Sequence, residues 1–234
     1  MTTSLVYTQV NRVSTDICAK ALHTSVSDLH EAMGGTLAKA HTMSHLMRPL
    51  LAGVRIAGPA VTAHCPAADN LMMHKSLYLA QKGDVLVVQC PESGAQWGDM
   101  AAFYAKQKGL AGVVVDGFIR DTDDLIEMKS AVWSTKIGPS SPQKIGHGSV
   151  NAPIVCDGVY VEPGDLVVAD GDGVIVIPRQ QAESVVARAL ERKNKEDAVR
   201  HLILNGEHPW HLHACDKNYD ALKIQDIQST WNQQ

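Results

Sequence analysis

The chain has 234 residues, of which 45 % are apolar, and this length allows one sizeable core or one core with a terminal extension. Its formal net charge of −4 argues against a broad phosphate-binding surface for nucleic acid. An acidic substrate would therefore need a local cation, which could be an arginine, a lysine or a metal ion.

The first part of the chain reads as helix followed by strands. Apolar residues at helical spacing predict a helix over Ser14–Gly34. The stretch Met47–His64 predicts two short strands, with Ala57-Gly58-Pro59 as the turn between them. A second helix is predicted over Asn70–Lys82, and the β-branched run Val85–Val88 after it predicts a buried strand.

The central part has the clearest pattern. Residues Asp99–Lys108 predict a helix, which Gly109 ends at the usual position of a C-terminal glycine. Leu110–Val115 predicts another buried strand. Strand, helix and strand joined by short links form a βαβ unit, so the two strands should be parallel.

The last part of the chain, from Asp121 onward, has a less regular order of helices and strands. A short helix should start at Asp121, and residues 155–177 predict strands interrupted by turns at 162–165 and 170–173. Residues 180–205 predict a long polar helix that could reach over a neighbouring subunit, and the tail 206–234 is mixed. The expected fold is α/β with mixed parallel and antiparallel strands, in one domain over residues 1–205. The tail should pack on that domain or on a neighbouring subunit.

Two loops could carry chemistry. Residues 94–101 place Gly94 and Gly98 between a strand and the Asp99 helix, where exposed N–H groups and the helix dipole favour a carboxylate or a phosphate. At the end of the next strand, Arg120 precedes Asp121, Asp123 and Asp124. Acids this close repel one another unless a cation is present, and Mg²⁺ or Mn²⁺ prefers such oxygen ligands.

Each loop alone also has an ordinary structural interpretation. The first could be a plain turn with Asp99 as a first-turn acid. In the second, Asp121 could cap the helix and Asp124 could complete a box-like turn. Together they are more specific, because the ends of neighbouring parallel strands lie side by side and both loops should face one cleft.

The spacing Asp99, Arg120-Asp121 and Asp124 reads D-x20-R-D-x2-D. It resembles the D-x20-R-D-x2-E/D signature of the class II pyruvate aldolases related to the RraA fold, which cleave 4-hydroxy-4-methyl-2-oxoglutarate or 4-carboxy-4-hydroxy-2-oxoadipate. Landmarks of similar order and spacing extend the resemblance over about residues 10–205, and they are Asp69-Asn70 with His74, residues 83–88, residues 148–153 and residues 171–174.

The resemblance implies a β/β/α swivelling-type sandwich with mixed sheets and a long C-terminal helix, assembled as a homotrimer or a dimer of trimers. It implies that Asp121 binds Mg²⁺ or Mn²⁺ directly, and that Asp99 and Asp124 act through metal-bound waters. Arg120 would contact the pyruvate carbonyl and carboxylate region. The backbone of the Gly98 loop, at Met100 and Ala101, would bind the carboxylate.

The resemblance also implies that a glutamate from the neighbouring subunit's long helix completes the metal's water shell. Glu196 matches best and Glu191 is the fallback. The implied activity is aldol cleavage to pyruvate, with oxaloacetate decarboxylation as a side activity and aromatic catabolism as the setting. The alternatives are another metal-enolate lyase or decarboxylase, and a non-catalytic RraA-type regulator that binds a ribonuclease. Lys144 and Arg179 are candidates for the distal end of the substrate.

Other possible sites are weaker. His211, His213 and Cys215 lack the spacing of a closed zinc site, and Asp170-Gly171-Asp172-Gly173 lacks the later glutamate of a calcium loop. The five cysteines are widely spaced without a C-x-x-C, which favours a reducing compartment. The N-terminus has no signal-peptide pattern and no apolar run approaches a membrane span, so the expected location is the cytoplasm.

Overall fold

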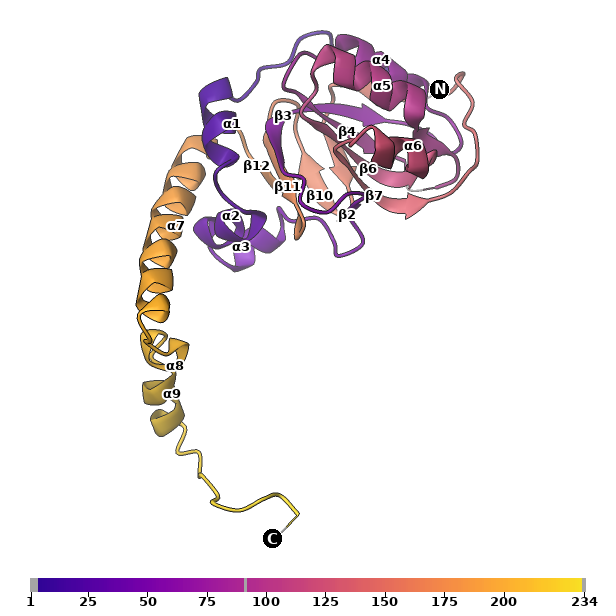
Figure 1. Cartoon of the computed structure of the whole chain (residues 1–234). Helices are drawn as coiled ribbons and strands as arrows, with labels where there is room; N and C mark the ends of the chain where they lie inside the picture. Colours follow the sequence, from indigo (N-terminus) through magenta and orange to yellow (C-terminus); the bar gives the residue numbers. More distant parts are fainter. Residues whose placement is uncertain (1–3, 91, 233–234) are drawn as a thin grey trace. The chain divides into compact units, whose positions relative to one another are not determined.

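The computed structural model describes residues 4–90 and 92–232, and the chain divides into two compact units, residues 1–190 and 191–234 (Figure 1). The division falls inside the long helix α7 (Ala182–Leu204), whereas the sequence-based division lies after residue 205. Whether the tail packs on its own domain or on a neighbouring subunit stays a prediction.

The first unit alternates helices and strands. Its helices before α7 are α1 (Thr15–Ala21), α2 (Val26–Met33), α3 (Thr36–Lys39), α4 (Leu71–Leu79), α5 (Asp99–Lys108) and α6 (Thr122–Glu127). Its strands are β1 (Leu5–Val6), β2 (Arg48–Pro49), β3 (Ile56–His64), β4 (Val85–Gln89), β5 (Ala95–Trp97), β6 (Gly112–Ile119), β7 (Val132–Ile137), β8 (Ser149–Val150), β9 (Ile154–Cys156), β10 (Val159–Val161), β11 (Leu166–Asp170) and β12 (Gly173–Ile177).

The strands form one mixed sheet and a separate β9–β10 hairpin. The main path runs β1-β8-β3-β4-β6-β7-β2, β5 pairs with β6, and β11 and β12 join through β3. Strands β4 and β6 are parallel, as the βαβ pattern predicted, and α5 connects them. The hairpin of β11 and β12 is antiparallel and turns at residues 170–173, which confirms a turn there.

Alternating apolar side chains pack between four layers, helix, sheet, sheet and helix, and the mixed sheet supplies both sheet layers because β3 pairs with β11 in one and with β4 in the other (Figure 1). Leu86 and Val88 of β4 pack under α4 and α5, while Val85 and Val87 face the opposite way, toward β11 and β12. The outer face of β11 and β12 is covered by α1, α2 and the start of α7. This layered arrangement confirms the expected fold class.

The predicted turn at Ala57-Gly58-Pro59 is wrong, because β3 is one strand that runs straight through these residues. Pro59 lies where β3 changes partners, from β11 on one side to β4 from Ala60 onward, so its missing N–H leaves no gap in the ladder. Gly58 is required by close approach, since a Cβ there would clash with the carbonyl oxygen of Gly83.

The single helix predicted over residues 14–34 is also wrong, because α1 and α2 are separate. Thr24 turns back to donate its hydroxyl to the carbonyl of Ala21 at 2.8 Å. Ser25 then opens α2 with a capping box, in which its side chain and that of Asp28 each accept a backbone N–H. The serine and aspartate three residues apart were the sequence signal for this break.

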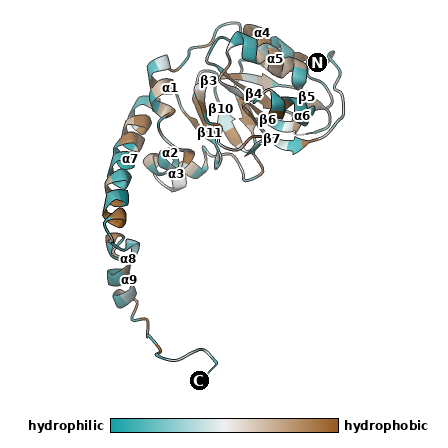
Figure 2. Cartoon of the chain, in the orientation of Figure 1, coloured by the Kyte–Doolittle hydropathy of each residue, from teal (hydrophilic) through white to brown (hydrophobic). Residues whose placement is uncertain are grey.

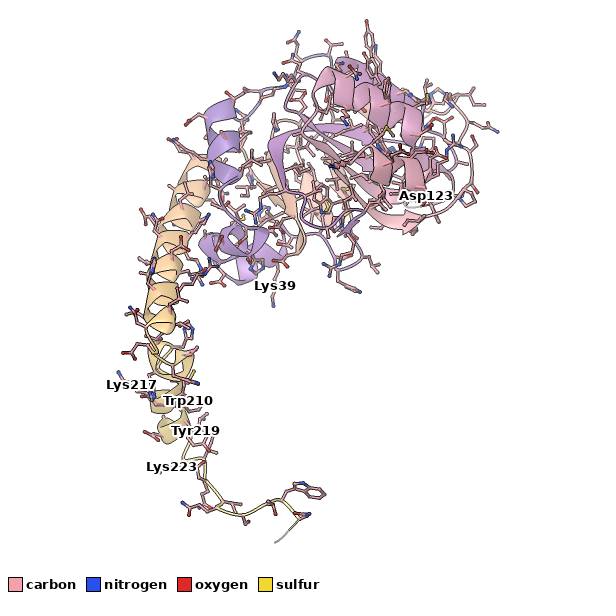
Figure 3. All side chains as sticks on the ribbon, viewed as in Figure 1. Lys39, Asp123, Trp210, Lys217, Tyr219 and Lys223 are labelled. Atoms are coloured by element: carbon pink, nitrogen blue, oxygen red, sulfur yellow. The ribbon has the colours of Figure 1, made fainter. Side chains whose placement is uncertain are left out.

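The second unit contains the end of α7 and the short helices α8 (Pro209–Leu212) and α9 (Cys215–Ala221). The rings of Trp210 and Tyr219, labelled in Figure 3, meet edge to face at 5.5 Å. Along α7, hydrophilic and hydrophobic residues alternate (Figure 2). No helix of the described chain combines the length and apolar character that a membrane span requires.

Candidate functional site

The candidate site lies where β5 and β6 end side by side. Trp97 of β5 pairs with Ile119 of β6, and the N–H of Arg120 donates to the carbonyl of Trp97 at 3.0 Å. This pairing brings Gly98 next to Arg120 and Asp121. The structure therefore joins the two loops that the sequence predicted to face one cleft.

The first turn of α5 receives carboxylate oxygens at its free N–H groups. Gly98 is the N-cap, with an extended backbone and no side-chain cap. The N–H of Asp99 donates to Oδ2 of Asp121 at 3.3 Å, and the N–H of Met100 donates to Oδ1 of Asp99 at 2.7 Å. The helix N-terminus thus has the anion-binding character expected of it.

Asp121 does not cap the helix that it precedes. It occupies the N-cap position of α6 but makes no side-chain capping bond, which overturns the capping interpretation. Its backbone is left-handed, with φ of 56°, a conformation that aspartate tolerates better than most residues. The side chain turns toward the Gly98 loop, and Oδ2 lies 3.2 Å from Nε of Arg120 in a half-exposed ion pair.

Gly98 leaves room for this ion pair. A Cβ on Gly98 would lie 2.5 Å from Oδ2 of Asp121 and 3.3 Å from Cγ of Arg120. Real Cβ atoms essentially never approach another atom this closely, so only glycine fits beside the carboxylate as it stands.

A cavity of about 280 Å³ opens beside these residues. It is lined by Asn70, Met73, His74, Ala95, Gln96, Trp97, Gly98, Asp99, Met100, Ala101, Arg120, Ser141, Pro142 and Lys144. The predicted residues Gly98, Asp99, Met100, Ala101 and Arg120 are all among them. His74 and Lys144 also line the cavity, whereas Arg179 does not.

Sequence reasoning missed three lining residues with orphaned polar atoms. Within the described chain, Oδ1 of Asn70, Oε1 of Gln96 and Nε1 of Trp97 are buried without a hydrogen-bond partner. Gln96 and Trp97 lie in the glycine loop that the sequence singled out, so their position was the available signal. Unpaired buried groups cost free energy and are concentrated here beside the cavity.

Two titratable groups near the cavity have altered pKa values. Burial, followed by the charge of Lys144, lowers the pKa of His74, which is therefore neutral at pH 7. Burial alone would raise the pKa of Asp69, but hydrogen bonds from three backbone N–H groups and the charge of Lys144 bring it below its usual range.

The remaining predicted residues are not gathered as closely. Asp124 is exposed on α6. Glu196 lies in the second unit, where Oε1 is 3.2 Å from Nη2 of Arg192, and Glu191 begins that unit. Across residues 4–90 and 92–232 there is no group of three or more His, Cys, Asp or Glu side chains arranged to hold a metal. A metal here would need water among its ligands.

The cysteines offer no alternative nucleophile in the first unit. Burial raises the pKa of the Cys65 thiol to about 12 and that of Cys18 to about 11. Burial also raises the pKa of Cys90 and of Cys156. These thiols are protonated at neutral pH, and a protonated thiol is a poor nucleophile.

Comparison with known proteins identifies the family. The family described as "RraA-like: Aldolase/RraA" matches residues 26–176. The chain belongs to this RraA-like family. A Halalkalibacterium halodurans protein named "Putative 4-hydroxy-4-methyl-2-oxoglutarate aldolase" is 36 % identical over 165 residues, which cover 69 % of this chain and 78 % of that protein.

Two solved structures resemble this RraA-like chain. An uncharacterized protein from Pseudomonas syringae matches with a TM-score of 0.74 and 26 % identity, over 85 % of this chain and 96 % of that one. Streptomyces coelicolor RraAS2 matches with a TM-score of 0.73 and 30 % identity, over 82 % of this chain and 99 % of that one. It is described as an unusual member of the RNase ES inhibitor RraA protein family. The family therefore contains proteins named for catalysis and for inhibition.

Proposed function

We propose that this protein is a divalent-metal-dependent aldolase, which cleaves 4-hydroxy-4-methyl-2-oxoglutarate or 4-carboxy-4-hydroxy-2-oxoadipate to pyruvate and a second 2-oxo acid. The observation that carries the proposal is the position of Asp121. Its carboxylate leaves the helix cap free and lies against the Gly98 loop, 3.2 Å from the guanidinium of Arg120. The name of the Halalkalibacterium relative supports the same reaction.

Mg²⁺ or Mn²⁺ fits the residues at this position. The side chain of Asp121 is 30 % exposed, so its carboxylate is reachable from solvent. Magnesium binds through one or two carboxylates and keeps several waters, and Asp99 and Asp124, in the first turns of α5 and α6, would hold those waters. When bound, such an ion supplies Lewis-acid stabilisation of negative charge on the substrate's oxygens.

The pyruvyl half of the substrate would bind at the start of α5. Its carboxylate would accept hydrogen bonds from the N–H groups of Met100 and Ala101. It would thereby replace Oδ1 of Asp99 as the acceptor for the N–H of Met100. The planar guanidinium of Arg120 would donate to the C2 carbonyl oxygen. No lysine Schiff base is required.

The reaction then follows the movement of charge. A water held by Asp99 or Asp124 accepts the proton of the C4 hydroxyl, and the electron pair of that O–H bond forms the new C4 carbonyl. The C3–C4 bond breaks, its electrons form the enolate of pyruvate, and Arg120 stabilises the negative charge on the enolate oxygen. The water that accepted the proton then gives a proton to C3, which yields pyruvate. Oxaloacetate would lose CO₂ to form the same enolate, so decarboxylation is expected as a side activity.

We further propose that Glu196 acts from a neighbouring subunit, in a homotrimer or a dimer of trimers. Its pairing with Arg192 holds the carboxylate on the exposed surface of α7, where another copy of the chain could use it. Activity that is lost on dilution together with oligomerisation would support this role. A fully active monomer would refute it.

The test of the function uses adjacent acids of different roles. Asp121→Ala should abolish metal-dependent pyruvate release, and Arg120→Ala should lower kcat by about 10²–10³-fold, as removal of one oxyanion donor does. Asp123→Ala is the matched control, because Asp123 is exposed on α6 and lies outside the signature (Figure 3). Equal activity in all three variants would contradict the assignment.

A binding function is the second candidate, because RraAS2 belongs to a family of ribonuclease inhibitors by its description. A regulator of this kind would act without a metal-dependent reaction. Inhibition of a ribonuclease that persists in Asp121→Ala, with no pyruvate released by the wild type from any substrate, would favour this candidate. Pyruvate release from a substrate of another kind would favour a different metal-enolate lyase.

A further inference from the structure

The loop of residues 138–148 is tied to the segment before α4. The N–H of Gln143 donates to the carbonyl of Ala68 at 2.7 Å, and the N–H of Asn70 donates to the carbonyl of Gln143 at 3.0 Å. These two bonds form a short bridge between chain segments far apart in sequence. The loop is thereby fixed beside the cavity that Asn70 lines.

Asp69 fixes the same loop on the other side of Lys144. Its Oδ2 accepts the N–H of Ile145 at 2.6 Å and that of Gly146 at 2.8 Å, while Oδ1 accepts the N–H of Leu71 at 2.8 Å. Asp69 is only 4 % exposed, so these charge-assisted bonds are shielded from water. Lys144 is thus held between two anchored neighbours.

Lys144 and Arg120 are the two basic residues among the cavity's described lining side chains. They differ in their partners. Arg120 is paired with Asp121, whereas the ammonium of Lys144 has no hydrogen bond or ion pair to any described residue. Of the two cations, Lys144 is the one whose charge lowers the pKa of His74. The two cations therefore have different surroundings, which are Asp121 for Arg120, and His74 and Asp69 for Lys144.

The surroundings of Lys144 suit a single carboxylate. His74 is half-buried and neutral at pH 7, so it adds a hydrogen-bond donor or acceptor without adding charge. The carboxylate of Asp69 is already engaged by three backbone N–H groups, so the ammonium of Lys144 is the group left to pair with one substrate carboxylate.

We propose that Lys144, assisted by His74, binds the substrate's second carboxylate and selects dicarboxylic over monocarboxylic 2-oxo acids. Asp69 is the positioning residue that holds Lys144 over the cavity. The proposal assigns specificity within the aldolase site and so rests on the proposed function. Because it concerns binding, it can be tested without turnover.

The test uses two ligands that cannot be cleaved and that differ in one carboxylate, 2-oxoglutarate and 2-oxopentanoate. Calorimetric titration of the Mg²⁺-loaded full chain should give about 10–100-fold tighter binding of 2-oxoglutarate, the range expected for one charge-assisted contact. Lys144→Ala should remove that preference and leave the affinity for 2-oxopentanoate unchanged. Lys144→Arg should restore part of it, and Asp69→Asn should reduce it.

Lys39→Ala is the control, because Lys39 is an exposed lysine of α3 in the same unit (Figure 3). If Lys144→Ala keeps the preference for 2-oxoglutarate, or weakens the binding of both ligands equally, then Lys144 does not recognise the second carboxylate. If the wild type releases no pyruvate from any hydroxy acid but Lys144→Ala still loses the preference, the aldolase proposal fails and the role of Lys144 stands. A wild type without any preference would overturn the proposal directly.

Discussion

Replacing Gly98 by alanine tests whether the contact of the glycine loop with Asp121 serves the chemistry. The new Cβ would lie 2.5 Å from Oδ2 of Asp121, so that oxygen must move by roughly 1 Å to reach an ordinary contact near 3.5 Å. The same methyl group also crowds Arg120. Both side chains of the proposed site are therefore displaced together.

The expected cost falls on activity and not on stability. A misplacement of about 1 Å can cost about 10²-fold in rate, so kcat/KM should fall by roughly 100-fold, or about 2.7 kcal/mol of transition-state stabilisation. The backbone of Gly98 is extended, with φ of −159°, which alanine adopts without strain. The displaced atom is the end of a side chain, so the melting temperature should change little.

The assay compares pyruvate release and thermal unfolding in Gly98→Ala and Gly171→Ala. Gly171 is exposed in the β11–β12 turn, and a Cβ there would meet nothing within 4 Å. The control should keep wild-type activity and stability. A Gly98→Ala protein with unchanged kcat/KM would refute the reasoning, because the site would then tolerate a displaced Asp121.

Three further predictions concern the metal and two buried acids. Treatment with EDTA should abolish pyruvate release and Mg²⁺ should restore it, and activity that survives chelation would contradict the metal role. Arg12→Ala should lower the free energy of unfolding in urea by about 3 kcal/mol, because it removes the cation that pairs with the buried carboxylate of Asp84. The two oxygens of Asp84 accept hydrogen bonds from Nε and Nη2 of Arg12, each at 2.8 Å, and a loss near zero would show that Asp84 does not need this cation. The lowered pKa of Asp69 means that its stabilisation is present above the usual carboxyl pKa and is lost as the pH falls through the lower folded value. Asp69→Asn should therefore flatten the acid side of the melting-temperature profile, and an unchanged acid side would contradict this.

The βαβ unit and the Gly98 loop could be predicted because their signals are local. A β-branched run, a helical period and Gly109 at a left-handed C-terminus specify strand, helix and stop within about 25 residues. Parallel pairing of β4 and β6 then follows from the short crossover. The meeting of Gly98 with Arg120 is a geometric consequence of that topology.

Where the sequence misled or left a choice open, the deciding contacts come from residues that are distant in the chain. Pro59 reads as a turn residue, but β11 and β4 supply partners on both sides of the place where its N–H is missing. For Asp121 the sequence left helix capping open beside a role as ligand, and the contact of its carboxylate with the Gly98 loop decides against capping. Nothing near residues 57 to 59 in the sequence indicates that β11 and β4 are the neighbours of Pro59.

The surroundings of Lys144 could not be predicted from the sequence. Lys144 stood out only as a possible contact, because its place depends on Asp69, which is 75 positions earlier and accepts the N–H groups that follow Lys144. The orphaned polar atoms of Gln96 and Trp97 are recognised only by their burial in the folded protein. Such features follow from tertiary packing and have no local pattern.

The most direct test of the central claim is pyruvate release from 4-hydroxy-4-methyl-2-oxoglutarate by the full chain with Mg²⁺, measured beside Asp121→Ala and Asp123→Ala. The account predicts metal-dependent release by the wild type and by Asp123→Ala, and none by Asp121→Ala. Release that is unaffected by the loss of Asp121, or a folded, metal-loaded wild type that releases no pyruvate, would contradict it.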